Sequence, residues 1–365
     1  MVLLATAGSK RVLLLQAARA QLGLPAAAVL EWRDWLERPQ SLNSALGAAC
    51  LFKIEPPGDD PAAHLRLLQD GCRRLDRPAP RAPEHGELLA MDAWFAGFSA
   101  AMARLSGQLA DLPSAQVAKV MNAPSEIRLM TDKLACQRHL AEHGVPTPAL
   151  LGRVHGYDHL RSLLKEHGLD RVYLKPRYGS SASGVVAYRH NRAGREQATT
   201  SASIVRTGGS VQLFNVKRIV RHEQTADIAA LVDALAAQQL YAEAWLDKPR
   251  HGDGHYDLRA VAIAGRPAHL VARMGTRMMT NLHLDNQRRD ATELLDAADM
   301  AALEAAVLRA ASAFPASGVA GYDLVVRRGQ ARVLEANAFG DLLPGLLWQG
   351  QDTYAAQLRA FTDRG

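Results

Sequence analysis

The sequence predicts a mixed α/β and α+β protein: a small N-terminal domain built on a parallel sheet, followed by two lobes of strands, hairpins and helices. Through the first 110 or so residues, short apolar runs alternate with helix-like stretches, a rhythm typical of a parallel sheet. From about Asn122 to the end, strands and hairpins alternate with helices. With 365 residues, 48% of them hydrophobic, the chain is long enough for two or three domains with separate cores.

The N-terminal domain is predicted from strands at residues 2–6, 27–30 and 50–54 and helices at 10–22 and 64–74. Gly8, Ser9 and Lys10 follow the first strand and could cradle a phosphate. They belong to no complete phosphate-binding motif, however, so a plain strand-to-helix turn is favoured. A proline-rich connection at 77–83 precedes one long amphipathic helix at 88–109, which leads to the next domain.

The rest of the chain is predicted to be richer in strands. Helices are expected at residues 131–143, 225–237 and 292–314, and strands at 171–176, 184–188, 211–220, 239–246, 257–264, 269–273, 319–326 and 331–337.

Composition and charge limit the function classes. The formal net charge of +6 comes from 43 basic residues spread among 37 acidic ones, without the basic stripe and interleaved aromatics typical of a nucleic-acid binder. Anionic small substrates or a modest solubility bias explain the charge equally well. No apolar run approaches the length of a membrane span, and the start lacks signal-peptide features, so we expect no membrane partner and a cytoplasmic protein. Cys50, Cys72 and Cys136 are odd in number and far apart, which argues against disulfides or a thiolate zinc site.

The first chemical signal is a lysine at a strand end followed by a loop of glycines and serines. Lys175 is followed by Gly179, Ser180, Ser181 and Gly184. Small residues let backbone N–H groups turn toward phosphate oxygens, and the lysine supplies a fixed positive charge. Glycine- and serine-rich hairpin loops also occur without a ligand, so both interpretations stay open at this point.

The second signal is a pair of C-terminal strands that carry acids inside apolar runs. If residues 328–330 form a three-residue turn, Asp323 lies opposite Glu335, and Asn337 shares their face because strands have a period of two. Two carboxylates and an amide oxygen suit Mg²⁺, which proteins hold with one or two carboxylates and substrate phosphates. The alternative is a simple acid pair at a sheet edge, although an unpaired charge in an apolar strand is costly.

The order of these residues resembles the ATP-grasp superfamily. It runs from Lys133 on a helix through Lys175 and its loop, the acidic strand of Glu243 and the Asp257-Leu258-Arg259 strand to Asp323 and Glu335-Ala336-Asn337. The resemblance spans about residues 122–337. The run at 279–284, after Arg259 and Arg273, is similar to the branch that includes the ribosomal-protein glutamate ligases. The implied domains are a Rossmann-like pre-ATP-grasp domain at 1–115, a central lobe with the glycine-rich lid at 116–240 and a C-terminal lobe with the magnesium site at 241–365.

The resemblance also implies roles for individual residues. Lys133 and Lys175 would contact ATP phosphates, and the loop of Gly179, Ser180, Ser181 and Gly184 would close over them. Glu243, Trp245 and Leu246 would hold adenine; Asp323, Glu335 and Asn337 would bind one or two Mg²⁺ ions; and Arg259, Arg273 and Asn281 would line the pocket for the transferred phosphate and the acyl acceptor.

The implied activity is an ATP-dependent carboxylate–amine ligase that forms an acyl phosphate and releases ADP and phosphate. Its substrates would be small-molecule or peptide carboxylates and amines, and a homodimer stays open. An ATP-grasp phosphotransferase acting on a hydroxyl and a non-catalytic ATP-binding regulatory protein are the alternatives.

Two positions depart from the family pattern. Some carboxylate–amine ligases have an arginine where this chain has Gly321, so Arg273 or Arg277 is expected to supply that charge. The residues after Asn281 are not glycine-rich as in the glutamate ligases.

Asp341, which follows Gly340, either lines the mouth of the metal site or caps a turn.

Overall fold

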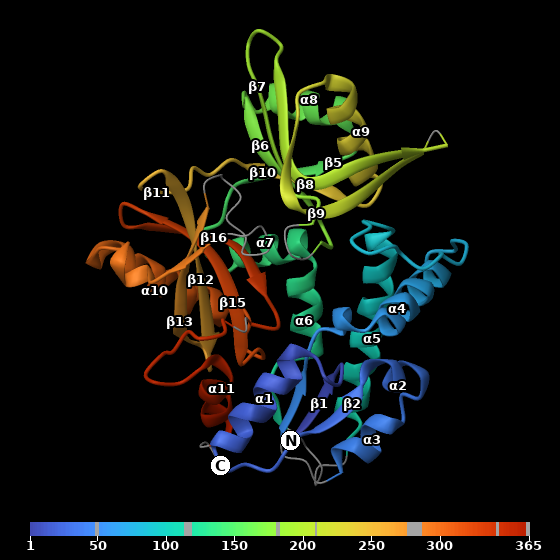
Figure 1. The fold of residues 1–365 in the computed structure, drawn as a ribbon, viewed down its shortest axis with the longest axis vertical. Helices are drawn as coiled ribbons and strands as arrows, with labels where there is room; N and C mark the ends of the chain where they lie inside the picture. The colour runs from blue at the N-terminus through green and yellow to red at the C-terminus, as the bar shows by residue number, and fades with distance from the viewer. Residues whose placement is uncertain are drawn as a thin grey trace.

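The computed structural model describes residues 1–47, 51–112, 119–179, 183–208, 210–275, 287–340 and 343–362. Figure 1 shows three parts, each built around one sheet: the N-terminal domain, a central lobe at the far end of the long axis, and a third sheet beside the helices that join them. The predicted fold class is confirmed, because one sheet is parallel and the other two are antiparallel.

The N-terminal domain is a parallel sheet in the order β2-β1-β3-β4, flanked by helices. Its strands are β1 (Val2–Ala5), β2 (Ala28–Glu31), β3 (Leu51–Ile54) and β4 (Lys119–Val120), and its helices are α1 (Lys10–Gln21), α2 (Trp32–Glu37), α3 (Ser41–Leu46), the 3-10 turn η1 (Pro57–Asp59), α4 (Pro61–Arg74) and α5 (Met91–Ala110). Helix α4 begins where Asp60 accepts hydrogen bonds from two backbone N–H groups and Pro61 occupies the first turn. The last helix, α11 (Thr353–Thr362), packs against α1, with Tyr354 and Leu358 in the same core as Leu3.

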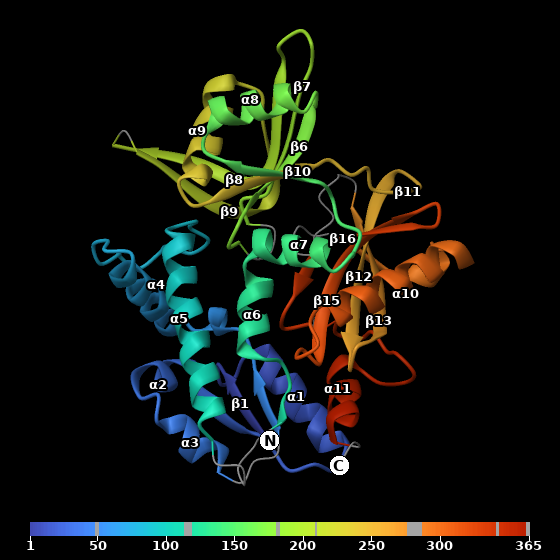
Figure 2. The same ribbon diagram turned by 180° about the vertical axis from the view of Figure 1, so that it is seen from behind.

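The central lobe is a six-stranded antiparallel sheet in the order β5-β10-β6-β7-β8-β9, packed with α8 and α9 (Figures 1 and 2). Its elements are β5 (Leu150–Val154), α8 (Tyr157–Glu166), β6 (Arg171–Pro176), β7 (Val186–His190), β8 (Glu196–Thr207), β9 (Ser210–His222), α9 (Thr225–Ala236) and β10 (Leu240–Ala244). The edge strand β9 pairs with the connection before α5: Leu88 N–H donates to Leu213 O at 2.8 Å and Asn215 N–H to Gly86 O at 2.7 Å. This strap ties the central lobe to the N-terminal domain.

The third sheet, in the order β14-β13-β12-β15-β16, is antiparallel and carries α10 on one face. Its elements are β11 (Arg250–His251), β12 (Gly254–Ile263), β13 (Arg266–Gly275), β14 (Gln287–Arg289), the 3-10 turn η4 (Ala291–Glu293), α10 (Ala297–Ser312), β15 (Val319–Arg327) and β16 (Gln330–Asn337). Leu258, Ala260 and Tyr322 share a core with Leu303 and Val307 of α10. On the opposite face, Val261, Ile263 and Val271 pack with Ala356 of α11 in a separate core, and Asp257 and Arg259 lie further along β12.

Two further helices stand between the lobes, where one helix was expected at 131–143. They are α6 (Pro124–Thr131) and α7 (Lys133–Glu142). Asp132 interrupts them with an extended backbone, and its side chain accepts a hydrogen bond from Ala135 N–H at 3.1 Å. Helix α7 therefore matches the helix expected at 131–143 and starts two residues later because Asp132 is its N-cap, whereas α6 was not predicted.

The prediction also missed β5, β8, α8 and α11, and the expected helix at 292–314 spans only Ala297–Ser312. Helix α10 starts later because Asp296 is its N-cap, accepting from Asp299 N–H at 2.8 Å. No helix in the described part of the chain is long and apolar enough to cross a membrane.

Helices α4 and α5 cross at backbone contact distance. A Cβ atom at Gly97 would overlap the carbonyl oxygen of Leu67, and one at Gly71 would overlap that of Ala93. Trp94 stacks on Phe98, with ring centroids 5.1 Å apart, and fills the space beside the crossing. The two glycines therefore hold the helices as one rigid pair.

We expect Gly97→Ala to lower the free energy of unfolding by about 1–3 kcal/mol or more, because the new methyl group must push the two backbones apart. Gly107→Ala is the matched control: it lies on the same helix with no atom within 4 Å of the new Cβ, and it should be neutral or stabilising by up to about 1 kcal/mol. Urea unfolding of both variants checks this, and equal effects at the two positions would contradict the close crossing.

Candidate active site

Charged side chains form a row on the face of the third sheet that does not contact α10. In the strand register, Arg259 of β12 lies opposite Asp323 of β15, which lies opposite Glu335 of β16. Asn337 pairs with Gly321, two residues along, and therefore shares this face. The predicted convergence of Asp323, Glu335 and Asn337 on one face is confirmed.

A bulge produces this register, not the three-residue turn that the sequence suggested. Arg327 pairs with Gln330, so the turn has only two residues, Arg328 and Gly329, both at positive φ as a tight hairpin requires. That turn alone would place Asp323 opposite Leu334. The register shifts between Asp323 and Leu324, which restores the pairing of Asp323 with Glu335.

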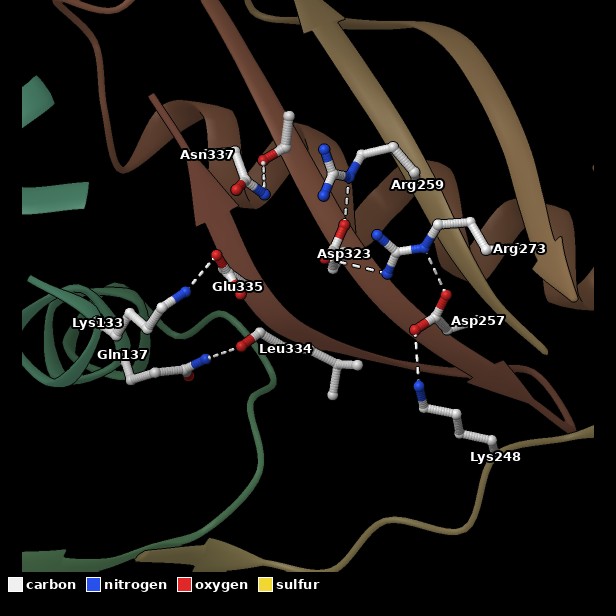
Figure 3. Close-up of polar contacts among 11 residues, drawn as sticks. Lys133, Gln137, Lys248, Asp257, Arg259, Arg273, Asp323, Leu334, Glu335 and Asn337 are labelled. Atoms are coloured by element: carbon white, nitrogen blue, oxygen red, sulfur yellow. Dashed lines mark hydrogen bonds and ion pairs between the residues drawn. The ribbon is translucent and has the colours of Figure 1, made fainter. Parts of the chain in front are cut away.

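The acids and bases of this row form a continuous network, drawn in Figure 3. Arg259 Nε donates to Asp323 Oδ1, and Arg273 Nη2 lies 3.0 Å from Asp323 Oδ2. Arg273 Nε donates to Asp257 Oδ1 at 2.7 Å, and Lys248 Nζ donates to Asp257 Oδ2 at 2.8 Å. The side chains of Asp257, Arg273 and Asp323 are at least nine-tenths buried and those of Arg259 and Lys248 are 11% exposed, so each charge depends on its neighbours for solvation.

The network determines the protonation of its acids. Burial acts to raise the pKa of Asp257, but the charges of Arg273 and Lys248 outweigh it and lower that pKa. Burial likewise opposes Arg259 and Arg273 at Asp323, and the arginines again lower the pKa. For Lys248, burial dominates and lowers the pKa despite the nearby Asp257. Both carboxylates are therefore ionised at neutral pH.

Helix α7 adds a further cation at the Glu335 end of the row. Lys133 Nζ donates to Glu335 Oε1, and Gln137 donates to the backbone carbonyl of Leu334 (Figure 3). The helix is positioned at its start, where Asp132 accepts two hydrogen bonds from Arg177, at 2.7 and 2.6 Å. This forked ion pair links α7 to the end of β6 in the central lobe.

A second group of polar side chains lies where β6 and β10 pair. Lys175 forms an ion pair with Glu243, which is 2% exposed. Glu243 Oε2 and the hydroxyl of Tyr173 are buried without a hydrogen-bond partner. Burial raises the pKa of Glu243 against the opposing charge of Lys175, and the negative charge of Glu335 raises it further. Glu335 of the third sheet and Glu243 of the central lobe are therefore electrostatically linked. Unsatisfied buried acceptors and donors are where a ligand would find partners.

An aromatic surface continues from this group. Trp245, directly after β10, stacks on Tyr173 with ring centroids 4.6 Å apart, and the Arg171 guanidinium lies 5.6 Å from the indole. Leu246 follows Trp245 and is half-buried. The flat ring and the free polar atoms are suited to a planar heterocycle with hydrogen-bonding edges.

Several sequence-predicted residues lie outside the described part of the chain: Cys50, Ser180, Ser181, Arg277, Asn281 and Asp341. Gly179 and Gly184 are described at either side of the loop, and a Cβ on Gly184 would crowd Pro176 and Leu235. Arg259 of the neighbouring strand supplies a positive charge near Gly321. Its side chain lies so close that Arg259 Cδ would be 3.6 Å from a Cβ atom added to Gly321. Arg273 also reaches Asp323, as expected.

The sequence analysis assigned no site role to four participants: Lys248, Asp257, Asp132 and Arg177. Asp257 was named only as part of the strand motif with Arg259, although its position two residues earlier places both side chains on one face. Arg177 and Asp132 lie 45 residues apart and carry no periodic signal. Lys248 follows β10 in an irregular segment whose course sequence patterns do not specify.

The donor set fits a hard divalent cation that takes its other ligands from phosphate and water. Asp323, Glu335 and Asn337 offer oxygen atoms, and the Glu335 side chain is 30% exposed. Both oxygens of Asp323 also pair with a guanidinium group, so a bound cation would share them with Arg259 and Arg273. The described residues contain no group of three or more His, Cys, Asp or Glu side chains that could hold a metal ion.

This architecture is the ATP-grasp fold. D-cycloserine synthetase DcsG is similar over 100% of this chain and 99% of its own, with 18% identity and a TM-score of 0.56. The ATP-grasp ligase PsnB, solved with its minimal precursor, covers 100% and 97% with 15% identity and a TM-score of 0.53. Biotin carboxylase from Campylobacter jejuni covers 99% and 70% with 13% identity and a TM-score of 0.58. At these identities the likeness concerns the fold.

Sequence comparison adds nothing to this. No family model matches the chain, and no curated protein matches it.

We expect Asp257→Asn to destabilise the fold by about 3–5 kcal/mol at pH 7, because Lys248 and Arg273 lose a buried counter-charge. The lowered pKa of Asp257 means that its stabilisation is present above the unfolded pKa of about 3.9 and is lost as the pH falls through the folded value. The difference in the free energy of unfolding between Asp257→Asn and wild type should therefore become smaller below about pH 4.

Urea unfolding between pH 7 and pH 2.5 measures this difference. Asp253→Asn is the control, since Asp253 is exposed in the turn before β12. A gap between Asp257→Asn and wild type that stays constant down to the lowest pH would contradict the electrostatic interpretation.

Proposed function

We propose that the chain is an ATP-dependent ligase that activates a carboxylate as an acyl phosphate and joins it to an amine, releasing ADP and phosphate. The observation that carries this proposal is the row of Arg259, Asp323 and Glu335 beneath Lys133, on an ATP-grasp fold. Phosphoryl transfer depends on positioning and charge neutralisation more than on covalent participation, and these are the residue types it needs.

In this proposal the nucleotide lies between the central lobe and the third sheet. Glu243, Trp245 and Leu246 hold adenine, where Glu243 Oε2 has no protein partner. Lys133 and Lys175 bind the phosphates, and the loop of Gly179, Ser180, Ser181 and Gly184 closes over them. A closed loop excludes water, which would otherwise hydrolyse an acyl phosphate.

Asp323, Glu335 and Asn337 would hold one or two Mg²⁺ ions. The ion, when bound, supplies charge to neutralise the phosphate oxygens. Arg259 and Arg273 already contact Asp323, and with Asn281 they would also face the transferred phosphoryl group. Asp257 and Lys248 keep Arg273 in place for that role.

The chemical sequence has two steps. A carboxylate oxygen attacks the terminal phosphorus of ATP, the bond to the β,γ-bridging oxygen breaks, and ADP leaves. The amine then attacks the acyl carbon, loses a proton, and phosphate leaves with the former carboxylate oxygen. Arginine and lysine side chains stabilise the charge on the transferred group in both steps.

The substrates belong to the same proposal. PsnB was solved with a precursor peptide and DcsG is a D-cycloserine synthetase, so a peptide or a small molecule is compatible with this fold. A relationship to the ribosomal-protein glutamate ligases rests on residues 279–284, which lie outside the described part of the chain. We also propose the domain limits 1–115, 116–240 and 241–365 and a cytoplasmic location.

We expect wild type to form an acyl phosphate that hydroxylamine traps as a hydroxamate when pooled carboxylates are supplied with ATP and Mg²⁺. Glu335→Gln should lower the yield at least about a hundredfold, because it removes a charge from the proposed metal site. Glu304→Gln, an exposed glutamate on α10, is the control. ADP release without hydroxamate in the presence of a hydroxyl acceptor would favour a phosphotransferase, and no nucleotide turnover with any pool would favour a regulatory ATP binder.

We expect Lys175→Met to weaken binding of a non-hydrolysable ATP analogue about tenfold or more, because a charged contact to phosphate is lost. Lys165→Met is the matched control, since Lys165 is exposed on α8. Calorimetry measures both affinities, with the unfolding midpoint of each variant recorded beside them. Unchanged affinity in a folded Lys175→Met protein would move the phosphate site elsewhere.

A further inference from the structure

A cavity of about 240 Å³ opens between α2, α4 and α5 of the N-terminal domain. Figures 1 and 2 place these helices on the opposite side of the molecule from the third sheet, so the cavity is separate from the charged row. It takes no part in the proposed ligase site, and none of the residues assigned to that site lines it.

Arginines dominate its rim. Arg66, Arg73 and Arg74 come from α4, Arg104 comes from α5, and Asp70 is the only acid among the lining residues. Asp70 accepts hydrogen bonds from Arg66, at 3.1 Å, and from Arg73. Two of the four guanidinium groups therefore pair with the single carboxylate, and the lining residues carry a formal excess of three positive charges around a small volume.

The floor is apolar and consists of one leucine and three small residues. Leu36 of α2 and Gly97, Ala100 and Ala101 of α5 line it. Gly97 is also the residue at which α5 touches α4 backbone to backbone. The crossing cannot easily widen, so this part of the site needs little reorganisation on binding, while the arginine side chains around it are exposed.

We propose that this cavity binds a small organic anion that carries either two carboxylate groups or one phosphate group on a compact apolar body. The fork geometry of arginine matches both kinds of anion, and the small-residue floor accommodates the body. The volume lies below the roughly 300–1,000 Å³ of pockets that hold drug-sized ligands, so the ligand is the size of a small metabolite. Asp70 orients Arg66 and Arg73, which leaves Arg74 and Arg104 as the principal contacts.

Calorimetric titration with isophthalate and with phenyl phosphate tests this at constant, near-physiological ionic strength. The first probe carries carboxylates and the second a phosphate, so the tighter one identifies the anionic group. Inorganic phosphate should bind more weakly than phenyl phosphate, because it has no apolar body for the floor.

The deciding comparison is between two pairs of arginines. Arg74→Gln/Arg104→Gln should weaken binding at least about tenfold. Arg192→Gln/Arg195→Gln removes the same charge from the exposed turn between β7 and β8 and should leave binding unchanged. Lys175→Met should also leave it unchanged, which separates this cavity from the proposed nucleotide site.

Two results would overturn the proposal. One is the absence of saturable one-to-one binding of either probe to wild type. The other is an equal loss of affinity in the two arginine pairs, which would mean attraction to net charge alone. Both results are independent of whether the chain proves to be a ligase.

Discussion

Placing charges on a largely buried sheet face is possible only if each one meets an opposite charge, and that constraint organises the third sheet. Arg259 and Arg273 hold Asp323, and Arg273 and Lys248 hold Asp257. Removing one member would leave another uncompensated in a medium that solvates it poorly. The register of three strands and the bulge in β16 are therefore part of the electrostatics, because they bring these side chains within reach of one another.

Helix α7 extends the same constraint to the rest of the molecule. At its start, the paired Asp132 and Arg177 connect it to the central lobe, and Lys133 connects it to Glu335 of the third sheet. The ion pair between Lys175 and Glu243 lies close enough for Glu335 to raise the pKa of Glu243. A ligand that changes the charge at one of these places changes the free energy of the others.

The sequence predicted those parts of the structure that follow from periodicity. Strand alternation placed Asp323, Glu335 and Asn337 on one face correctly, although the turn between the strands has two residues and a bulge makes up the difference. It did not predict Lys248 or the partnership of Asp132 with Arg177, because irregular segments and contacts between distant residues leave no repeating pattern. The helix expected at 131–143 is present as α7, which starts at Lys133 because Asp132 is its N-cap, but α6 before it was not predicted.

The strap formed by residues 86–88 pairs with part of β9, the edge strand of the central sheet. Backbone groups of Leu213 and Asn215 on β9 are occupied by Leu88 and Gly86 of the same chain. An uncovered sheet edge is a template on which a strand from another molecule can add. The connection between domains thus also occupies part of an edge that another strand could pair with, and a proteolytic cut in this segment would expose residues 213–215 as well as remove a link between the central lobe and the N-terminal domain.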